Sequence, residues 1–267
     1  MPKRADRLLV EQGLAQSRER AKALIMEGVV YFKEVKVMKA SDTFPEDVSL
    51  TVREDPIPFV SRGGLKLDKA VRKYAIDLNG AVCLDVGAST GGFTDVMLKN
   101  GARHVYAVDV GYGQLDWKLR SDERVTCMER HNARMMEPSW FPETPVFASC
   151  DVSFISIKLI LPRMYECLAE GGEAVVLVKP QFEAGRNKVG KNGVVREEET
   201  HIEVLTAAAQ FASECGFRIK ALDHSPITGP KGNIEFLMYL EKSAESTEFD
   251  ILSEAKNVVR LSHEELS

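Results

Sequence analysis

The sequence predicts an α/β protein in which helices cover an open, mostly parallel sheet that ends in an antiparallel hairpin. Apolar segments typical of strands alternate with helical patterns from residue 81 to residue 240, the order expected of a parallel sheet. A glycine-rich turn at 87–92 follows the first of these strands and leads into a helix. A separate run of short helices and strands precedes it, so we also predict a small α+β domain at the N-terminus.

Length and composition are those of an ordinary globular chain. The 267 residues can form one large domain and one small one. We expect an N-terminal domain with its linker at 1–58, a main domain at 59–242 and an acidic C-terminal tail at 243–267. No apolar run approaches ~18 residues, and the N-terminus lacks the apolar core of a signal peptide. We therefore expect a cytoplasmic protein that has no membrane span.

The cysteines argue for a reducing compartment. They are odd in number, show no C-x-x-C spacing and lie mostly within apolar runs: Cys83, Cys127, Cys150, Cys167 and Cys215. We interpret them as buried free thiols. No cysteine pairs with a histidine at a spacing typical of metal ligands, so we expect no metal site.

The predicted N-terminal domain begins with two short helices. The first spans 4–12 and ends at Gly13, a common residue at helix C-termini. Ser17 is a suitable N-cap for the second helix, which ends at Gly28. Strand patterns at 29–32 and 34–37 predict a hairpin, and a last strand follows at 48–52.

Charge is segregated along the chain. Residues 1–40 contain nine Lys/Arg and five Asp/Glu, a net charge of +4, so the remaining 227 residues carry −9. The basic end is a candidate site for a polyanion. A solvated face of a helix would give the same charge pattern, and charge alone does not separate the two interpretations.

A glycine pair opens the main domain. Gly63 and Gly64 precede an amphipathic helix and could serve only as a hinge between domains. Lys66 lies close to them on that helix, however, where its side chain could reach an active site.

The next segment has the order strand, tight turn, helix. Glycines let the backbone of such a turn approach a ligand closely, although this turn lacks the G-x-G-x-x-G spacing of dinucleotide-binding proteins. A second strand at 104–110 contains Asp109, 22 residues beyond Gly87. An acidic residue at about this distance commonly accepts hydrogen bonds from a ribose.

The remaining elements continue the alternation. We predict strands at 125–128 and 145–151, a helix at 157–168, and a strand at 173–179 that is buried on both faces. A basic loop follows, then a helix at 198–215, a strand at 217–223, a strand at 233–240 and a possible final helix around Val258. The loop contains Arg186, Lys188, Lys191 and Arg196.

Charged side chains mark the carboxyl edge of the predicted sheet. Asp109, Asp151 and Lys179 lie at or beside the carboxyl ends of strands, and Glu235 lies near the start of an antiparallel one. Ligands of open α/β sheets bind along this edge. A lysine at the end of a doubly buried strand is hard to explain by packing; the alternative is a structural Lys–Asp ion pair.

The glycine-rich turn resembles the first motif of S-adenosylmethionine (SAM) methyltransferases, because Asp85-x-Gly87 is followed by Gly91-Gly92. The resemblance implies a Rossmann-like sheet, SAM as the cofactor and Asp109 as the partner of its ribose. The cofactor-binding residues it implies are Asp85, Gly87, Ser89, Gly91, Gly92, Phe93, Thr94, Asp109, Val110, Asn132 and Asp151.

The N-terminal domain resembles the S-four type RNA-binding domain, which is named for a ribosomal protein. The matching segments are Arg4-Ala-Asp-Arg-Leu-Leu9, Gly13-Leu-Ala-x-Ser-Arg-Glu-Arg-Ala21 and Ile25-x-x-Gly-Val-Val30. In that family paired helices present basic side chains to RNA phosphates. The RNA-binding residues implied are Arg4, Arg7, Arg18, Arg20 and Lys22.

Four residues of the main domain match the Lys-Asp-Lys-Glu tetrad of FtsJ-like RNA ribose 2′-O-methyltransferases in order and context: Lys66, Asp151, Lys179 and Glu235. Together with the N-terminal domain and segment 59–66, they make the chain similar to the TlyA (hemolysin A) family from residue 3 to about 242. The resemblance implies these four catalytic residues, methylation of ribosomal RNA, and ribosomal RNA or ribosomal subunits as partners. The family is also associated with a haemolytic activity, for which hydropathy gives no support.

A ribose hydroxyl is a weak nucleophile, so the implied reaction needs a base or strong polarisation of the O–H bond. Lys179 could act as that base in its neutral form. A nearby cation such as Lys66 would favour the neutral form, whereas Asp151 would oppose it and instead hold Lys179 in place. The sequence leaves this question open, and in-line positioning of the acceptor also contributes.

Other functions have weaker support. An adenine N6-methylase would be expected to carry an Asn/Asp-Pro-Pro-aromatic signature where this chain has 151–154, and Cys150 lacks the Pro-Cys context of a pyrimidine C5-methylase. The remaining alternative is a non-catalytic RNA- or ribosome-binding protein that retains a SAM site. Oligomeric state is not predicted.

Overall fold

The computed structural model describes residues 2–33, 35–53, 57–190, 192–229, 231–243 and 249–266. The chain divides into two compact units, Met1–Pro58 and Phe59–Ser267. Each unit contains its own cluster of buried apolar side chains, and each is described by itself.

The first unit is a small α+β fold. Ser17 caps α2 by accepting a hydrogen bond from the backbone N–H of Arg20 at 3.1 Å, and Gly28 ends that helix at a φ of +74°. Strand β2 is the centre of an antiparallel sheet in the order β3-β2-β5, and β1 pairs with β4. The predicted helix pair and hairpin are thus both present. The elements are β1 (Lys3–Arg4), α1 (Ala5–Glu11), α2 (Arg18–Glu27), β2 (Val30–Phe32), β3 (Val35–Lys36), β4 (Thr43–Phe44) and β5 (Leu50–Val52).

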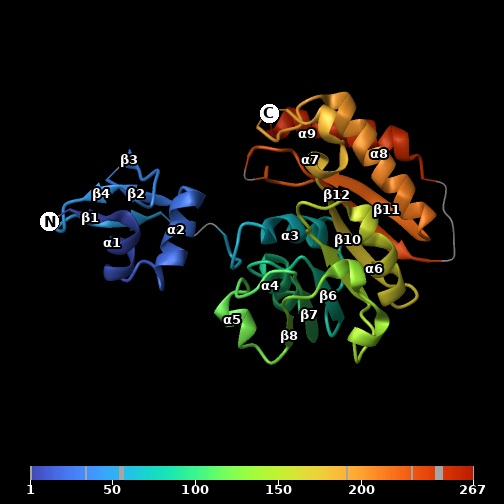
Figure 1. Ribbon diagram of the computed structural model, residues 1–267, viewed down its shortest axis with the longest axis horizontal. Helices are drawn as coiled ribbons and strands as arrows, with labels where there is room; N and C mark the ends of the chain where they lie inside the picture. The colour runs from blue at the N-terminus through green and yellow to red at the C-terminus, as the bar shows by residue number, and fades with distance from the viewer. Residues whose placement is uncertain are drawn as a thin grey trace. The chain divides into compact units, whose positions relative to one another are not determined.

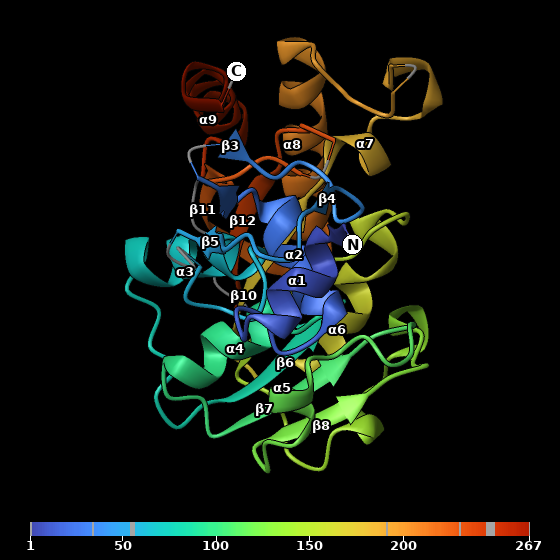
Figure 2. The ribbon, with the colours of Figure 1, turned by 90° about the vertical axis from the view of Figure 1, so that its left-hand side faces the viewer.

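The second unit is built on a seven-stranded sheet in the order β11-β12-β10-β9-β6-β7-β8. Within the described residues, β12 alone runs opposite in direction to the other strands of this sheet, which confirms the predicted mostly parallel sheet with a terminal hairpin. Figure 2 shows β11 at one end of this sheet and β8 at the other. The strands are β6 (Val82–Val86), β7 (His104–Val108), β8 (Val125–Met128), β9 (Phe147–Cys150), β10 (Glu173–Val178), β11 (Phe217–His224) and β12 (Phe236–Lys242).

Helices cover both faces of this sheet (Figure 1). Helices α6, α8 and α9 pack with one face into a single apolar core, and α3 and α4 lie against the other. The α-helices are α3 (Gly64–Lys73), α4 (Gly92–Lys99), α5 (Trp117–Arg120), α6 (Leu161–Cys167), α7 (Pro180–Glu183), α8 (Glu198–Glu214) and α9 (Ile251–Leu266). Short 3₁₀ turns are η1 (Ala133–Met135), η2 (Pro138–Trp140), η3 (Ile157–Leu159) and η4 (Arg186–Lys188).

Two segments differ from the prediction. The single helix expected at 157–168 is divided into η3 and α6 at Ile160, because Pro162 has no N–H for a helical hydrogen bond and tolerates only the first turn of a helix. The residues after Lys179, expected as loop, begin with the short helix α7, in which Pro180 occupies the first turn.

The residues expected as a separate acidic tail are also different. Residues 244–248 and 267 lie outside the described residues, but α9 belongs to the second unit. Its Ala255, Val258 and Val259 are buried in the main core, so apolar periodicity outweighs the acidic composition of this segment. No helix of the described residues is long and apolar enough to cross a membrane.

Candidate active site

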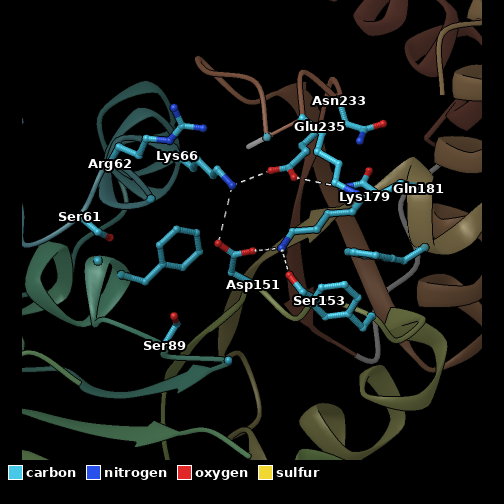
Figure 3. A pocket seen from close by; sticks show the side chains of 18 of the residues that line it. Ser61, Arg62, Lys66, Ser89, Asp151, Ser153, Lys179, Gln181, Asn233 and Glu235 are labelled. Atoms are coloured by element: carbon cyan, nitrogen blue, oxygen red, sulfur yellow. Dashed lines mark hydrogen bonds and ion pairs between the residues drawn. The ribbon is translucent and has the colours of Figure 1, made fainter. Parts of the chain in front are cut away.

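A cavity of about 560 Å³ opens at the carboxyl edge of the sheet in the second unit. Its wall combines the glycine-rich turn after β6, the residues that follow β9 and β10, the start of α3, and the segment before β12 (Figure 3). The edge that the sequence predicts as the site therefore contains a cavity large enough for a small-molecule ligand.

Strand register explains why distant residues meet there. Val178 pairs with Phe236 across the antiparallel β10–β12 ladder, which places Lys179 opposite Glu235. Asp151 follows β9 beside Gly87, and its backbone N–H donates to the carbonyl of Val86 at 2.9 Å. A Cβ at Gly87 would lie 2.8 Å from the carbonyl oxygen of Asp151, so the close approach of these two loops requires glycine.

The four predicted catalytic side chains form one network (Figure 3). The Nζ of Lys66 lies 2.6 Å from Glu235 Oε2 and 3.8 Å from Asp151 Oδ2. The Nζ of Lys179 lies 2.5 Å from Asp151 Oδ1. Cations and carboxylates therefore alternate, and Asp151 lies between the two ammonium groups.

Because these charged side chains are largely buried, each needs a neighbour of opposite charge. The side chains of Lys66 and Lys179 are 9% and 8% exposed, and that of Glu235 is 2% exposed. Buried charges are tolerated when they are paired, and removal of one partner leaves a costly unpaired charge. The Lys–Asp ion pair considered as the alternative is present, but both of its members line the cavity.

Close helix packing places Lys66 at the cavity. A Cβ at Gly64 would lie 2.7 Å from Cγ of Phe59, and a Cβ at Gly92 would lie 2.8 Å from the backbone nitrogen of Gly64. The first turns of α3 and α4 touch only because these positions are glycines. The glycines at the start of α3 are thus packed into the site rather than serving only as a hinge.

The predicted cofactor residues fall into three groups. Residues of the turn line the cavity, as does Asp151: Gly87, Ser89, Gly92 and Phe93. Asp85 and Thr94 lie beneath the turn and are fully buried. Asp85 Oδ2 accepts a hydrogen bond from Thr94 Oγ1 at 2.6 Å, and Oδ1 accepts one from Ser149 Oγ at 3.0 Å. Both carboxylate oxygens thus hold the turn to its neighbours.

Four other predicted cofactor residues do not line this cavity. Asp109 accepts hydrogen bonds from the backbone N–H groups of Ser89 at 2.8 Å and Gly111 at 2.7 Å, so it braces the glycine-rich turn. Asn132 caps η1 by accepting from the N–H of Arg134. The others are Gly91, at a φ of +95°, and the exposed Val110.

The predicted RNA-binding residues belong to the first unit. The buried carboxylate of Asp6 accepts hydrogen bonds from Arg4 at 3.0 Å and from Arg18 at 2.9 Å, which fixes both guanidinium groups. These two arginines hold the pKa of Asp6 at about 2. Arg7 lies 3.6 Å from Glu11, and Arg20 and Lys22 lie on α2.

Several cavity residues were not predicted. Ser153 accepts a hydrogen bond from Lys179 Nζ at 2.9 Å, and Gln181 donates one to Glu235 Oε1 at 3.3 Å. Phe154 is 91% exposed and its ring centroid lies 5.2 Å from that of Phe182. These four residues lie two or three positions after Asp151 or Lys179 in the sequence, and this proximity could have identified them.

In the predicted basic loop, Lys188 pairs with Glu203, whereas Lys191 and the side chain of Arg186 lie outside the described residues.

The buried carboxylate of Asp85 gives a first prediction. Burial raises its pKa to about 6, despite the hydrogen bonds from Thr94 and Ser149. Because an unfolded aspartate titrates near ~3.9, the ionised group costs roughly 3 kcal/mol of folding free energy at pH 7. This cost disappears as the pH falls from about 6 to about 4, because the folded protein takes up the proton first.

Asp85→Asn is therefore expected to gain stability relative to the wild type as the pH rises from about 4 to 7, by roughly 3 kcal/mol. Urea unfolding at both pH values measures this change, and Asp77→Asn is a control at an exposed aspartate. A stability difference that is the same at both pH values would contradict the assignment.

Comparison with known proteins agrees with the geometry. Residues 59–242 match the family described as FtsJ-like methyltransferase. The "Putative rRNA methyltransferase YqxC" of Bacillus subtilis is 49% identical over 98% of this chain and 95% of its own length. The "16S/23S rRNA (cytidine-2'-O)-methyltransferase TlyA" of Mycobacterium tuberculosis is 42% identical over 89% of each chain.

The fold also agrees with that of a solved structure. The structure described as "Putative hemolysin from Streptococcus thermophilus" superposes with a TM-score of 0.80 at 48% identity, over 99% of this chain and 96% of its own. The chain therefore belongs to the FtsJ-like methyltransferase family, within the group of relatives that includes TlyA.

Proposed function

We propose that the protein transfers a methyl group from SAM to a ribose 2′-hydroxyl of ribosomal RNA, and that it acts in the cytoplasm. The observation that carries this proposal is the network of Lys66, Asp151, Lys179 and Glu235 in a cavity beside the glycine-rich turn. A relative 42% identical to this chain is named as an enzyme of that reaction.

The residues of the cavity suit SAM. The glycine-rich turn exposes its backbone to the cavity at Gly87 and Gly92, where side chains would collide with neighbouring backbone. In the proposal this turn would hold the cofactor, Asp109 would bind its ribose and Asn132 its adenine. When bound, SAM supplies a methyl group that is activated on a sulfonium.

The acceptor side of the cavity carries the acid–base chemistry. Lys179 would accept the proton of the ribose hydroxyl, because its Nζ lines the cavity and is held by Asp151 at 2.5 Å. Lys66 is paired with Glu235 at 2.6 Å and lies farther from Asp151, at 3.8 Å. We infer that Glu235 and Lys66 position the acceptor and the ion-pair network, while Asp151 positions Lys179.

The first unit would anchor the RNA in the manner of an S-four type domain. Its positive charge is concentrated in residues 1–40, whereas residues 41–58 carry one Arg and five Asp/Glu. The unit is therefore neutral as a whole, and attraction for phosphates depends on where its arginines lie. Arg4 and Arg18 are presented together on the buried Asp6, which supports a fixed site for phosphate.

Base methylation by a cysteine nucleophile has no support in this geometry. Cys150 is 1% exposed, and burial raises the pKa of its thiol to about 12, so it is not ionised near neutral pH. The other alternative is a non-catalytic RNA- or ribosome-binding protein with a SAM site. Incubation of ribosomal subunits with methyl-labelled SAM separates the two: an enzyme places label on ribosomal RNA, and a binding protein leaves the RNA unlabelled.

A further inference from the structure

Lys179 has a second fixed partner besides Asp151. Its Nζ donates a hydrogen bond to Oγ of Ser153 at 2.9 Å and lies 2.5 Å from Asp151 Oδ1 (Figure 3). A lysine side chain rotates freely about its Cε–Nζ bond unless its hydrogens are engaged. Two acceptors on the same loop therefore define the rotation of the terminal nitrogen.

The loop that carries Ser153 is itself held at both ends. Asp151 is tied to Val86 by its backbone N–H at 2.9 Å. At the other end, Glu183 accepts from Ser156 Oγ at 2.7 Å and from the N–H of Ile157 at 2.8 Å. Glu183 lies on α7, which starts directly after Lys179, so the lysine and the loop are joined to one another.

The backbone of this loop is strained at one residue. Phe154 adopts a φ of +65°, which is rare for a bulky side chain and strained. This left-handed residue directly follows Ser153, whose hydroxyl meets Lys179, and lies at a bend of the chain. Such conformations persist where the surrounding structure over-determines them.

We propose that Ser153 is a positioning residue that aims the lone pair of Lys179 at the acceptor hydroxyl, an inference that rests on the proposed function. After Lys179 has released one proton to solvent, its neutral amine has two N–H bonds and one lone pair in a tetrahedral arrangement. Ser153 Oγ accepts one N–H, Asp151 Oδ1 lies 2.5 Å from the same nitrogen on another side, and the lone pair occupies a remaining direction. In the reaction this lone pair takes the hydroxyl proton as the O–CH₃ bond forms and the S–CH₃ bond breaks.

Removal of the Ser153 hydroxyl should lower the rate of methyl transfer without weakening the binding of RNA or SAM. Ser153→Ala leaves one N–H of the amine without an acceptor, so the nitrogen rotates among several orientations. We expect kcat to fall about 10- to 100-fold, while KM for RNA and the Kd for SAM stay within about twofold. Ser153→Thr keeps the hydroxyl and should restore most of the rate. Ser139→Ala, at an exposed serine bonded to Glu137, is the matched control.

A readout independent of activity follows from the same geometry. In lysine-¹⁵N-labelled protein, the Nζ resonance assigned by its loss in Lys179→Ala should be sharp in the wild type and in Ser153→Thr. It should broaden or disappear in Ser153→Ala, with SAM binding as the control for folding. A resonance unchanged in Ser153→Ala, or a wild-type kcat in that variant, would overturn the inference. Absence of ribose methylation by the wild type would instead refute the proposed function.

Discussion

Lys179→Ala is expected to lower the single-turnover rate of methyl transfer by about 10²- to 10⁴-fold, the usual contribution of a general base. Among the described residues, the substitution leaves Asp151 with only the more distant Lys66, 3.8 Å away, as an ion-pair partner. Binding of SAM should remain near normal, because Lys179 follows β10 and the turn that would hold the cofactor follows β6. Rapid-quench kinetics with saturating RNA, and calorimetry with SAM, measure the two effects separately.

Two further substitutions separate the role of a base from that of a positive charge and provide a control. Lys179→Arg keeps the positive charge and the ion pair but does not deprotonate, so it should be nearly as inactive as Lys179→Ala. Lys256→Ala changes an exposed lysine on α9 and should leave the rate unchanged. Wild-type rates in either Lys179 variant would exclude its role as the base, and a rate retained only in Lys179→Arg would indicate a purely electrostatic role.

A protein that starts at Phe59 is expected to fold and bind SAM but to lose RNA affinity by roughly two orders of magnitude at physiological salt. The second unit has its own core and the whole cavity, which supports independent folding. It carries a net charge of −5, because residues 1–58 sum to zero, so it has little general attraction for phosphates. Methylation should fall with affinity and recover in part at high protein concentration.

Arg18→Ala combined with Arg20→Ala tests the same idea in the intact chain. Each lost phosphate contact should flatten the slope of log affinity against log salt by roughly 0.7–0.9. Glu19→Ala, between the two on α2, is a control that changes charge in the opposite direction. If the full-length, shortened and doubly substituted proteins have equal affinities and slopes, the first unit is not the anchor and the basic loop at 186–196 becomes the leading candidate.

The sequence predicted the sheet and the tetrad because both follow from general rules. Carboxyl ends of parallel strands share one edge, so Asp151 and Lys179 had to lie close together once their strands were recognised. Glu235 joined them because β12 is antiparallel. The helix around Pro162 was wrong for a reason that was visible in the sequence, since proline ends or opens helices.

Other features depend on tertiary contacts and could not be predicted from the sequence. The motif places Asp85 at the cofactor, but the side chain points beneath the turn to Thr94 and Ser149, and Ser149 is 64 residues away. The contact of Ser153 with Lys179 depends on a loop whose path is set by the left-handed Phe154. A final helix was expected around Val258, but the acidic composition of this segment concealed that its apolar residues Ala255, Val258 and Val259 join the main core.

Methylation of a ribose hydroxyl is most directly tested by the chemical position of the transferred methyl group. Ribosomal subunits treated with the wild-type protein and methyl-labelled SAM are digested to nucleosides, which are separated and identified by mass spectrometry. We predict label in a 2′-O-methylated nucleoside with the wild type, and none above background with Lys179→Ala. Label on a base, or unlabelled RNA with a wild-type protein that binds both SAM and the subunits, would contradict the account.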